Sequence, residues 1–72
     1  MNVLITFDDG QMVAGSVGKV SLARLQSQVG EEAIVMVERA FLVDGDDITE
    51  TGRTLAVYLR NAIRADYVPV RG

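Results

Sequence analysis

The sequence contains no cysteine and no histidine, and its only lysine is Lys19. Without cysteine there are no disulfide bonds, and without either residue the ordinary zinc sites are excluded. The same absences remove the most common general base and the strongest nucleophile. Nothing in the sequence orients Lys19 for a Ser–Lys mechanism. We therefore expect no enzymatic activity, no cofactor and no metal ion.

Long hydrophobic runs and an excess of positive charge are also missing. No apolar run approaches the roughly 18 residues that span a membrane, and the net charge of −3 disfavours broad adhesion to nucleic acid or to anionic lipid. Linkers and internal repeats are absent, so residues 1–72 are predicted to form one domain. We expect a cytoplasmic protein that does not bind a membrane, and the net negative charge argues against nucleic acid as its partner.

Apolar residues, by contrast, are abundant. They make up 49% of the chain before its seven glycines are counted, and the usual share is about 45–50% with glycine included. A domain of this size buries only about 60% of the surface that its unfolded chain exposes. We therefore expect an exposed apolar patch, which usually marks an interface. The alternative is a scatter of single exposed side chains that serve no partner.

The first half of the chain predicts a hairpin, a short helix and a strand. Residues 2–8 alternate like a strand, and Asp9-Gly10 suits a two-residue hairpin turn. Ser21 is a helix N-cap with Gly30 after the last turn, and residues 33–43 form a central strand with a break near Glu38-Arg39 and both faces largely covered. A helix from Glu31 is the alternative for that strand. The turn places one group of residues on the covered face of the hairpin: Val3, Ile5, Phe7, Met12 and Ala14.

The second half predicts a turn at residues 44–47, an amphipathic helix over residues 51–65, and an extended tail that includes Pro69. Asp47 and Glu50 have capping-box spacing for this helix. Its apolar stripe consists of Leu55, Tyr58, Leu59, Ala62 and Ile63. Its opposite side carries Arg53, Arg60 and Arg64. The predicted fold class is therefore α+β, with a small sheet built on the N-terminal hairpin.

Two clusters were tested as binding sites. The acidic residues after Asp44 do not have the EF-hand spacing, because Ile48 and Thr49 stand where a ligand and the glycine are needed, so a turn with a helix cap is favoured. The arginine stripe is either a solvated helix face or a docking surface for an acidic partner. The residues predicted to contact a partner are Leu4, Thr6, Val13, Arg53, Arg60 and Arg64.

Segments along the whole chain resemble the ubiquitin-like β-grasp family. They are Met1-Asn2-Val3-Leu4-Ile5, a turn ending in Gly10, Val17, the helix residues Leu22, Leu25 and Val29, Phe41-Leu42 before Gly45, Ile48, Gly52-Arg53-Thr54-Leu55 with Tyr58, and Arg71-Gly72. The resemblance implies a β-grasp fold, and a modifier or sulfur carrier that is conjugated through Gly72. The chain departs from the family at Arg71, where a second glycine is usual, at Pro69, and in the helical pattern of residues 51–65.

The functional prediction is a protein–protein interaction module that acts as a small regulator or inhibitor of a larger protein machine. A phage or mobile-element accessory protein is one such case. The predicted partner is another protein or a second copy of the chain. The alternatives are the conjugated modifier and a small nucleic-acid-binding regulator that uses Arg60 and Arg64.

Overall fold

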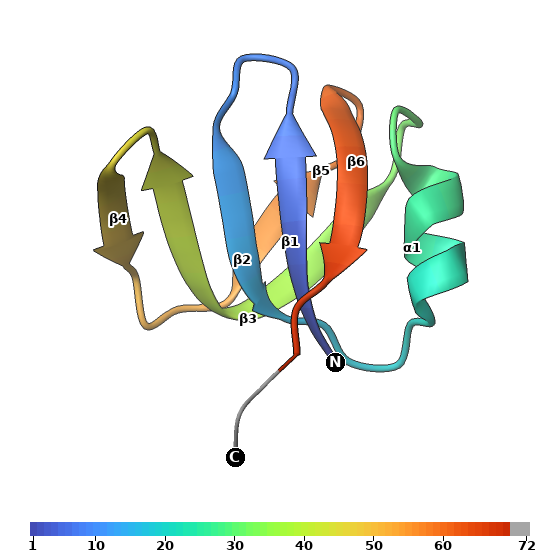
Figure 1. Ribbon diagram of the computed structural model, residues 1–72. Helices are drawn as coiled ribbons and strands as arrows, with labels where there is room; N and C mark the ends of the chain where they lie inside the picture. The colour runs from blue at the N-terminus through green and yellow to red at the C-terminus, as the bar shows by residue number, and fades with distance from the viewer. Residues whose placement is uncertain (70–72) are drawn as a thin grey trace.

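The computed structural model describes residues 1–69, which form six antiparallel strands and one short helix (Figure 1). In chain order these are β1 (Asn2–Phe7), β2 (Met12–Ser16), α1 (Leu22–Gln28), β3 (Ile34–Asp44), β4 (Asp47–Glu50), β5 (Leu55–Tyr58) and β6 (Ala62–Tyr67). The predicted α+β class is therefore wrong. The chain is mostly antiparallel β structure, and it has no second helix within residues 1–69.

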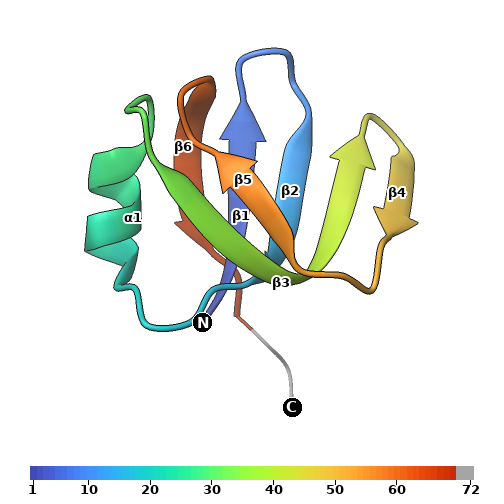
Figure 2. The same ribbon diagram turned by 180° about the vertical axis from the view of Figure 1, so that it is seen from behind.

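The sheet has the order β4-β3-β2-β1-β6, with β5 paired to β3 outside this path. The second half of β3 pairs with β2 and β4, whereas its first half pairs with β5. The views from the two sides show that the β3–β5 arm crosses over one face of β1 and β2 (Figures 1 and 2). The sheet therefore folds back on itself, and it has a concave inner face and a convex outer face.

The bend lies in the middle of β3, where the sequence predicted a break. The β2–β3 register shifts between Ala14 and Ser16, and Arg39 has a φ of 51°, so this break is a β-bulge. A Cβ atom at Gly15 would lie 2.5 Å from Cγ1 of Val37 and 2.7 Å from the carbonyl oxygen of Glu38. Only glycine therefore allows β3 to cross β2 this closely.

The core fills the inner face with small aliphatic side chains, and α1 closes one side of it. Ser21 caps α1, because its Oγ accepts a hydrogen bond from the backbone N–H of Arg24 at 3.2 Å. Leu25 of α1 is fully buried, and Gly30 follows the helix as predicted. The buried residues are Val3, Ile5, Val13, Val17, Leu25, Val35, Val37, Ala40, Val57, Leu59, Ala62 and Ala65.

The hairpin register differs from the predicted one by a single residue. The loop contains three residues, 8–10, because the N–H of Phe7 donates to Gln11 and the N–H of Gly10 donates to Phe7. Gly10 has a φ of +87°, which is typical of the last residue of such a loop. Ile5 consequently lies opposite Val13. A one-residue shift turns a whole strand over, so Met12 and Ala14 face outward and Val13 faces the core.

The predicted helix over residues 51–65 is instead β5, a turn and β6, and Asp47 and Glu50 lie in β4 without capping anything. The N–H of Ala62 donates to Leu59 across the turn. In β6, Phe7 pairs with Ala62 and Thr6 pairs with Arg64, which leaves Ile63 as the extra residue of a bulge. The bulge lets Ala62 and Ala65 both face the core, although they are three residues apart. This spacing imitates a helix in the sequence.

The two edges of the sheet differ. At the β6 edge, Nε2 of Gln26 in α1 donates to the carbonyl oxygen of Ala65 at 3.1 Å, so the helix covers part of this edge. The strand β4 pairs only with β3 in the part of the chain that the structure describes. Its other edge has no partner strand there, and the acidic residues Asp47 and Glu50 are the first and last residues of this strand. Among residues 1–69, the only helix is too short to cross a membrane.

Candidate partner-binding surfaces

The outer face of the sheet has an apolar centre. Residues that lie opposite one another in the register share a face, and the outward rows can be read from the strand pairs. One row runs Arg64, Thr6, Met12, Val43 and Ile48, and the next runs Asp66, Leu4, Ala14, Phe41 and Glu50. We call the six apolar members the outer patch: Leu4, Met12, Ala14, Phe41, Val43 and Ile48. An antiparallel sheet with one solvated face would normally carry polar residues at these positions.

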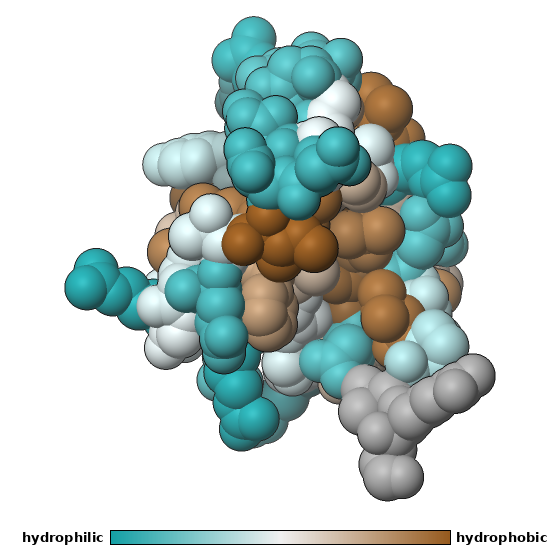
Figure 3. Space-filling view, turned by 60° about the vertical axis from the view of Figure 1, so that its left-hand side comes forward, coloured by the Kyte–Doolittle hydropathy of each residue, from teal (hydrophilic) through white to brown (hydrophobic). Residues whose placement is uncertain are grey.

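No described segment covers the outer patch. Ile48 is 69% exposed and Phe41 is 36% exposed, while the other members are half-buried by their neighbours. Seen from the β4 side, brown apolar surface lies across the middle of the molecule with teal hydrophilic surface around it (Figure 3). An apolar centre with a polar rim is the usual anatomy of a protein interface.

The aromatic residues follow the same distribution. The chain has two Phe and two Tyr, and none of the four belongs to the buried core. Tyr58 is 68% exposed on the outer side of β5, opposite the exposed Ile34 of β3. Aromatic side chains usually dominate cores and interfaces because each buries a large area. Here the core is built from Val, Ala, Ile and Leu, and the aromatic residues lie at or near the surface.

The structure separates the residues that the sequence grouped as partner contacts. Leu4, Thr6 and Arg64 share the outer face, and Thr6 lies directly opposite Arg64. Val13 lies in the core because of the register shift.

The predicted arginine stripe does not exist as one surface. Arg53 lies in the loop before β5, and Arg60 lies in the turn after it. Arg60 pairs with Glu32 at 3.2 Å, and Nε of Arg64 pairs with Asp66 at 2.8 Å. Gly72, the predicted conjugation terminus, is outside the described residues.

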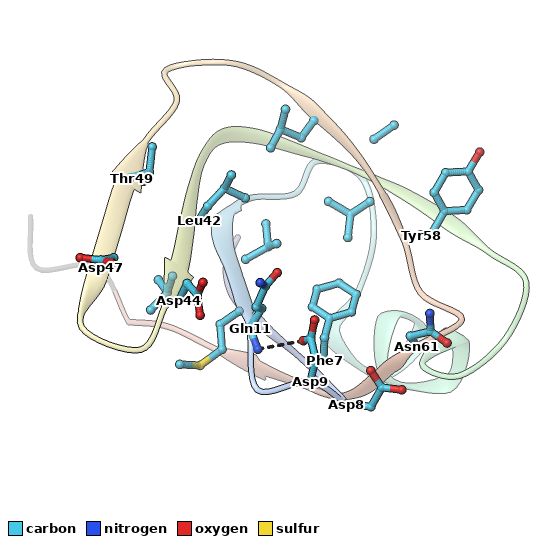
Figure 4. A pocket seen from close by; sticks show the side chains of 16 residues that line it. Phe7, Asp8, Asp9, Gln11, Leu42, Asp44, Asp47, Thr49, Tyr58 and Asn61 are labelled. Carbon is cyan, nitrogen blue, oxygen red and sulfur yellow. Dashed lines mark hydrogen bonds between the residues drawn. The ribbon is translucent and has the colours of Figure 1, made fainter.

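A second feature is a concave cavity of about 700 Å³ on the inner face, between β5 and the tips of the β1–β2 and β3–β4 hairpins. Figure 4 shows the side chains of Phe7 and Leu42 beside this space. Leu42 is 40% exposed although it belongs to the inner face, next to the buried Val13. Leu55, at the start of β5, also lines the cavity and is half-buried, two residues before the buried Val57. The floor of the cavity is therefore apolar and only partly covered.

The rim of this cavity is acidic. The β1–β2 tip contributes Asp8 and Asp9, and the β3–β4 hairpin contributes Asp44 and Asp47 (Figure 4). Asp44 and Asp47 are direct partners in the register, and like charges in that position destabilise a hairpin. None of these four residues forms an ion pair within residues 1–69. No lysine or arginine lines the cavity.

The turn predicted between Asp44 and Asp47 is confirmed, with Gly45 and Asp46 as its central residues. The described residues contain no group of three or more acidic side chains that could hold a metal ion. Sequence reasoning missed the meeting of the two acidic turns. The signal was present, because aspartates flank both turns, but only the strand order shows that both turns lie at the same end of the sheet.

Comparison with protein families, with curated proteins and with solved structures found no match for this chain. The resemblance to the ubiquitin-like family therefore stays a prediction.

Proposed function

We propose that this chain is a protein-binding domain without catalytic activity, and that it regulates or inhibits a larger protein assembly by docking through the outer patch. The observation that carries the proposal is the outer patch itself, which runs in two neighbouring rows across the four paired strands β1 to β4, with Phe41 in one row and Ile48 at the end of the other. Interfaces of this kind draw most of their binding energy from a few large side chains.

The arrangement around the patch supports a specific partner over general stickiness. Charged residues border the patch at both ends of one row, with the paired Arg64 and Asp66 on β6 and Glu50 on β4. A polar border around an apolar centre limits the orientations in which a partner can dock. Large exposed apolar surfaces are uncommon on monomeric proteins. A second polypeptide that covered the outer patch would remove this apolar surface from water.

The test is a quantitative pull-down from native lysate with the wild-type chain and a Phe41→Glu variant. Phe41 is partly exposed and makes no contribution to the buried core, so the variant is expected to fold. We expect it to lose at least about tenfold of the specifically recovered partner, because a charge at the centre of an interface must be desolvated without compensation. Sedimentation of each variant shows whether the recovered partner is instead a second copy.

The matched control is Met36→Glu, which places the same charge on an exposed apolar position in the first half of β3, outside both the outer patch and the cavity on the inner face. It should recover the partner as the wild type does. Equal loss in both variants would indicate general apolar adhesion. A Phe41→Glu variant that folds and binds the same partners as the wild type would refute the proposal.

A further inference from the structure

We propose that the concave cavity is a second binding site, which receives a peptide segment of another protein in which an apolar side chain is flanked by lysine or arginine. The site lies on the inner face of the sheet, and of the outer patch only Met12 and Val43 also line it, whereas Phe41, which is substituted to test the outer patch, does not. The inference therefore does not require that the outer patch bind anything, and different variants test it.

The apolar part of the ligand follows from the floor of the cavity. Leu42 of β3 and Leu55 of β5 both line the cavity with surface still exposed, and Phe7 is half-buried at the end of β1. The volume of about 700 Å³ lies within the range of about 300–1,000 Å³ that is typical of ligand sites. A bulky aliphatic or aromatic side chain would cover these groups and remove apolar surface from water on both partners.

The charge of the ligand follows from the rim. Asp8, Asp9, Asp44 and Asp47 all line the cavity, and no basic residue there balances them. Asp44 lies opposite Asp47 across the hairpin, so a cation bound beside them would offset part of their mutual repulsion. Lysine or arginine beside the inserted side chain would supply that charge with directed hydrogen-bond donors. An acidic or uncharged segment would leave the repulsion in place.

A different protein fits the cavity better than a second copy of this chain. The exposed apolar residue of this chain nearest to two arginines in sequence is Ile63, between Arg60 and Arg64. Arg60 already pairs with Glu32, and Arg64 already pairs with Asp66. Docking of this segment into another copy would have to break both pairs, whereas a foreign basic segment brings unpaired charges.

The test uses a fluorescein-labelled synthetic peptide that alternates arginine and leucine, titrated with the full chain and followed by fluorescence anisotropy. Backbone amide NMR shifts on the labelled protein locate the site. We expect shifts concentrated at Leu42, Leu55 and the two acidic turns, and an affinity that falls as salt is added. The double variant Asp44→Asn/Asp47→Asn should weaken binding about fivefold, in line with the loss of two exposed charge pairs.

The charge-matched control is Glu31→Gln/Glu38→Gln, which removes two acids outside the cavity and should bind within about twofold of the wild type. A peptide with glycine in place of leucine should bind at least about tenfold more weakly. Three outcomes would overturn the proposal: equal binding of the glycine peptide, equal weakening in both double variants, or amide shifts that map away from the cavity. Self-association that blocks the peptide, seen by sedimentation, would assign the cavity to a second copy instead.

Discussion

The two faces of the bent sheet are formed by the same strands, but the inner face is buried in the core and the outer face is exposed to solvent. On the inner face, Ile5 and Val37 are fully buried among small aliphatic side chains. On the outer face, residues next to them in sequence include Leu4 and Met36, which keep part of their surface in contact with solvent. Alternation along a strand separates the two sets with no change in backbone structure.

This difference indicates that the stability of the fold does not depend on the apolar residues exposed on the outer face. The fully buried core contains no aromatic residue, although the half-buried Phe7 packs against it from the inner face, and no buried side-chain polar atom lacks a partner within residues 1–69. The larger apolar residues of the outer face therefore are not needed to close the interior. Inner-face substitutions should change folding, and outer-face substitutions should change binding.

The most direct test of this difference is to shorten an isoleucine to alanine on each face of the sheet. Ile5→Ala should lower the free energy of unfolding by about 2–5 kcal/mol, because it leaves a cavity in a fully packed site. Ile48→Ala, at a position 69% exposed, should change it by less than about 0.5 kcal/mol. Urea denaturation followed by circular dichroism measures both values. Similar losses in the two variants would show that the outer patch is structural.

A second substitution tests the close crossing of β2 and β3. Gly15→Ala should cost about 1–3 kcal/mol, since its Cβ would overlap Val37 and the backbone of Glu38. The control is Gly18→Ala, whose Cβ would meet nothing within 4 Å and which should leave the midpoint of urea denaturation nearly unchanged. If Gly15→Ala were as stable as the control, the two strands would not cross as described.

A third substitution concerns the bend between β4 and β5. Oγ1 of Thr51 donates to the carbonyl oxygen of Ala40 at 2.7 Å and accepts from the N–H of Arg53 at 3.1 Å. Thr51→Val keeps the shape and removes both hydrogen bonds, so we expect a loss of about 1 kcal/mol in thermal or urea denaturation. Thr54→Val is the control, because no hydrogen bond of its hydroxyl is formed within residues 1–69. If both variants lost a similar amount of stability, the hydrogen bonds of the Thr51 hydroxyl would not be the cause of the loss.

The smallest effect is expected at the polar border of the outer patch. Arg64→Gln removes the pair with Asp66, whose side chains are 66% and 41% exposed, and should change stability by no more than about 0.5 kcal/mol. Binding of the partner of the outer patch should respond more strongly, chiefly through the association rate and its salt dependence. Stopped-flow association with the purified partner compares the two effects. If the free energy of unfolding fell by more than the free energy of binding, Arg64 would contribute to folding and not to partner binding.

The first half of the fold could be predicted because its signals are local. Ser21 and Gly30 mark the ends of α1, and the strand over residues 33–43 with its break at Glu38-Arg39 is confirmed. Its predicted cover on both faces is wrong, since Ile34 and Met36 are exposed. The register of β2 was missed because the loop contains one more residue than Asp9-Gly10 suggested.

The second half could not be predicted from local sequence patterns, because a β-bulge interrupts the two-residue alternation of buried and exposed side chains that marks a strand. Ala62 and Ala65 face inward together only because Ile63 bulges out against β1, a strand almost sixty positions earlier. Gly52 and Asn61 inside the supposed helix were the available warnings. The acid-rimmed cavity was beyond prediction for a similar reason, since the turns after Phe7 and Asp44 meet only through the completed strand order.

The hydrogen bond from Gln26 to Ala65 has a consequence for how copies of this molecule can stack. A β-sheet can continue through many copies only if each molecule has an unpaired edge strand on both sides. Each added copy then leaves one free edge strand to which the next copy can pair. Here the helix covers part of the β6 border, whereas β4 and β5 each pair only with β3 within residues 1–69. A further copy that added its strand to β6 would have to displace this helix contact, which disfavours fibre growth at that border.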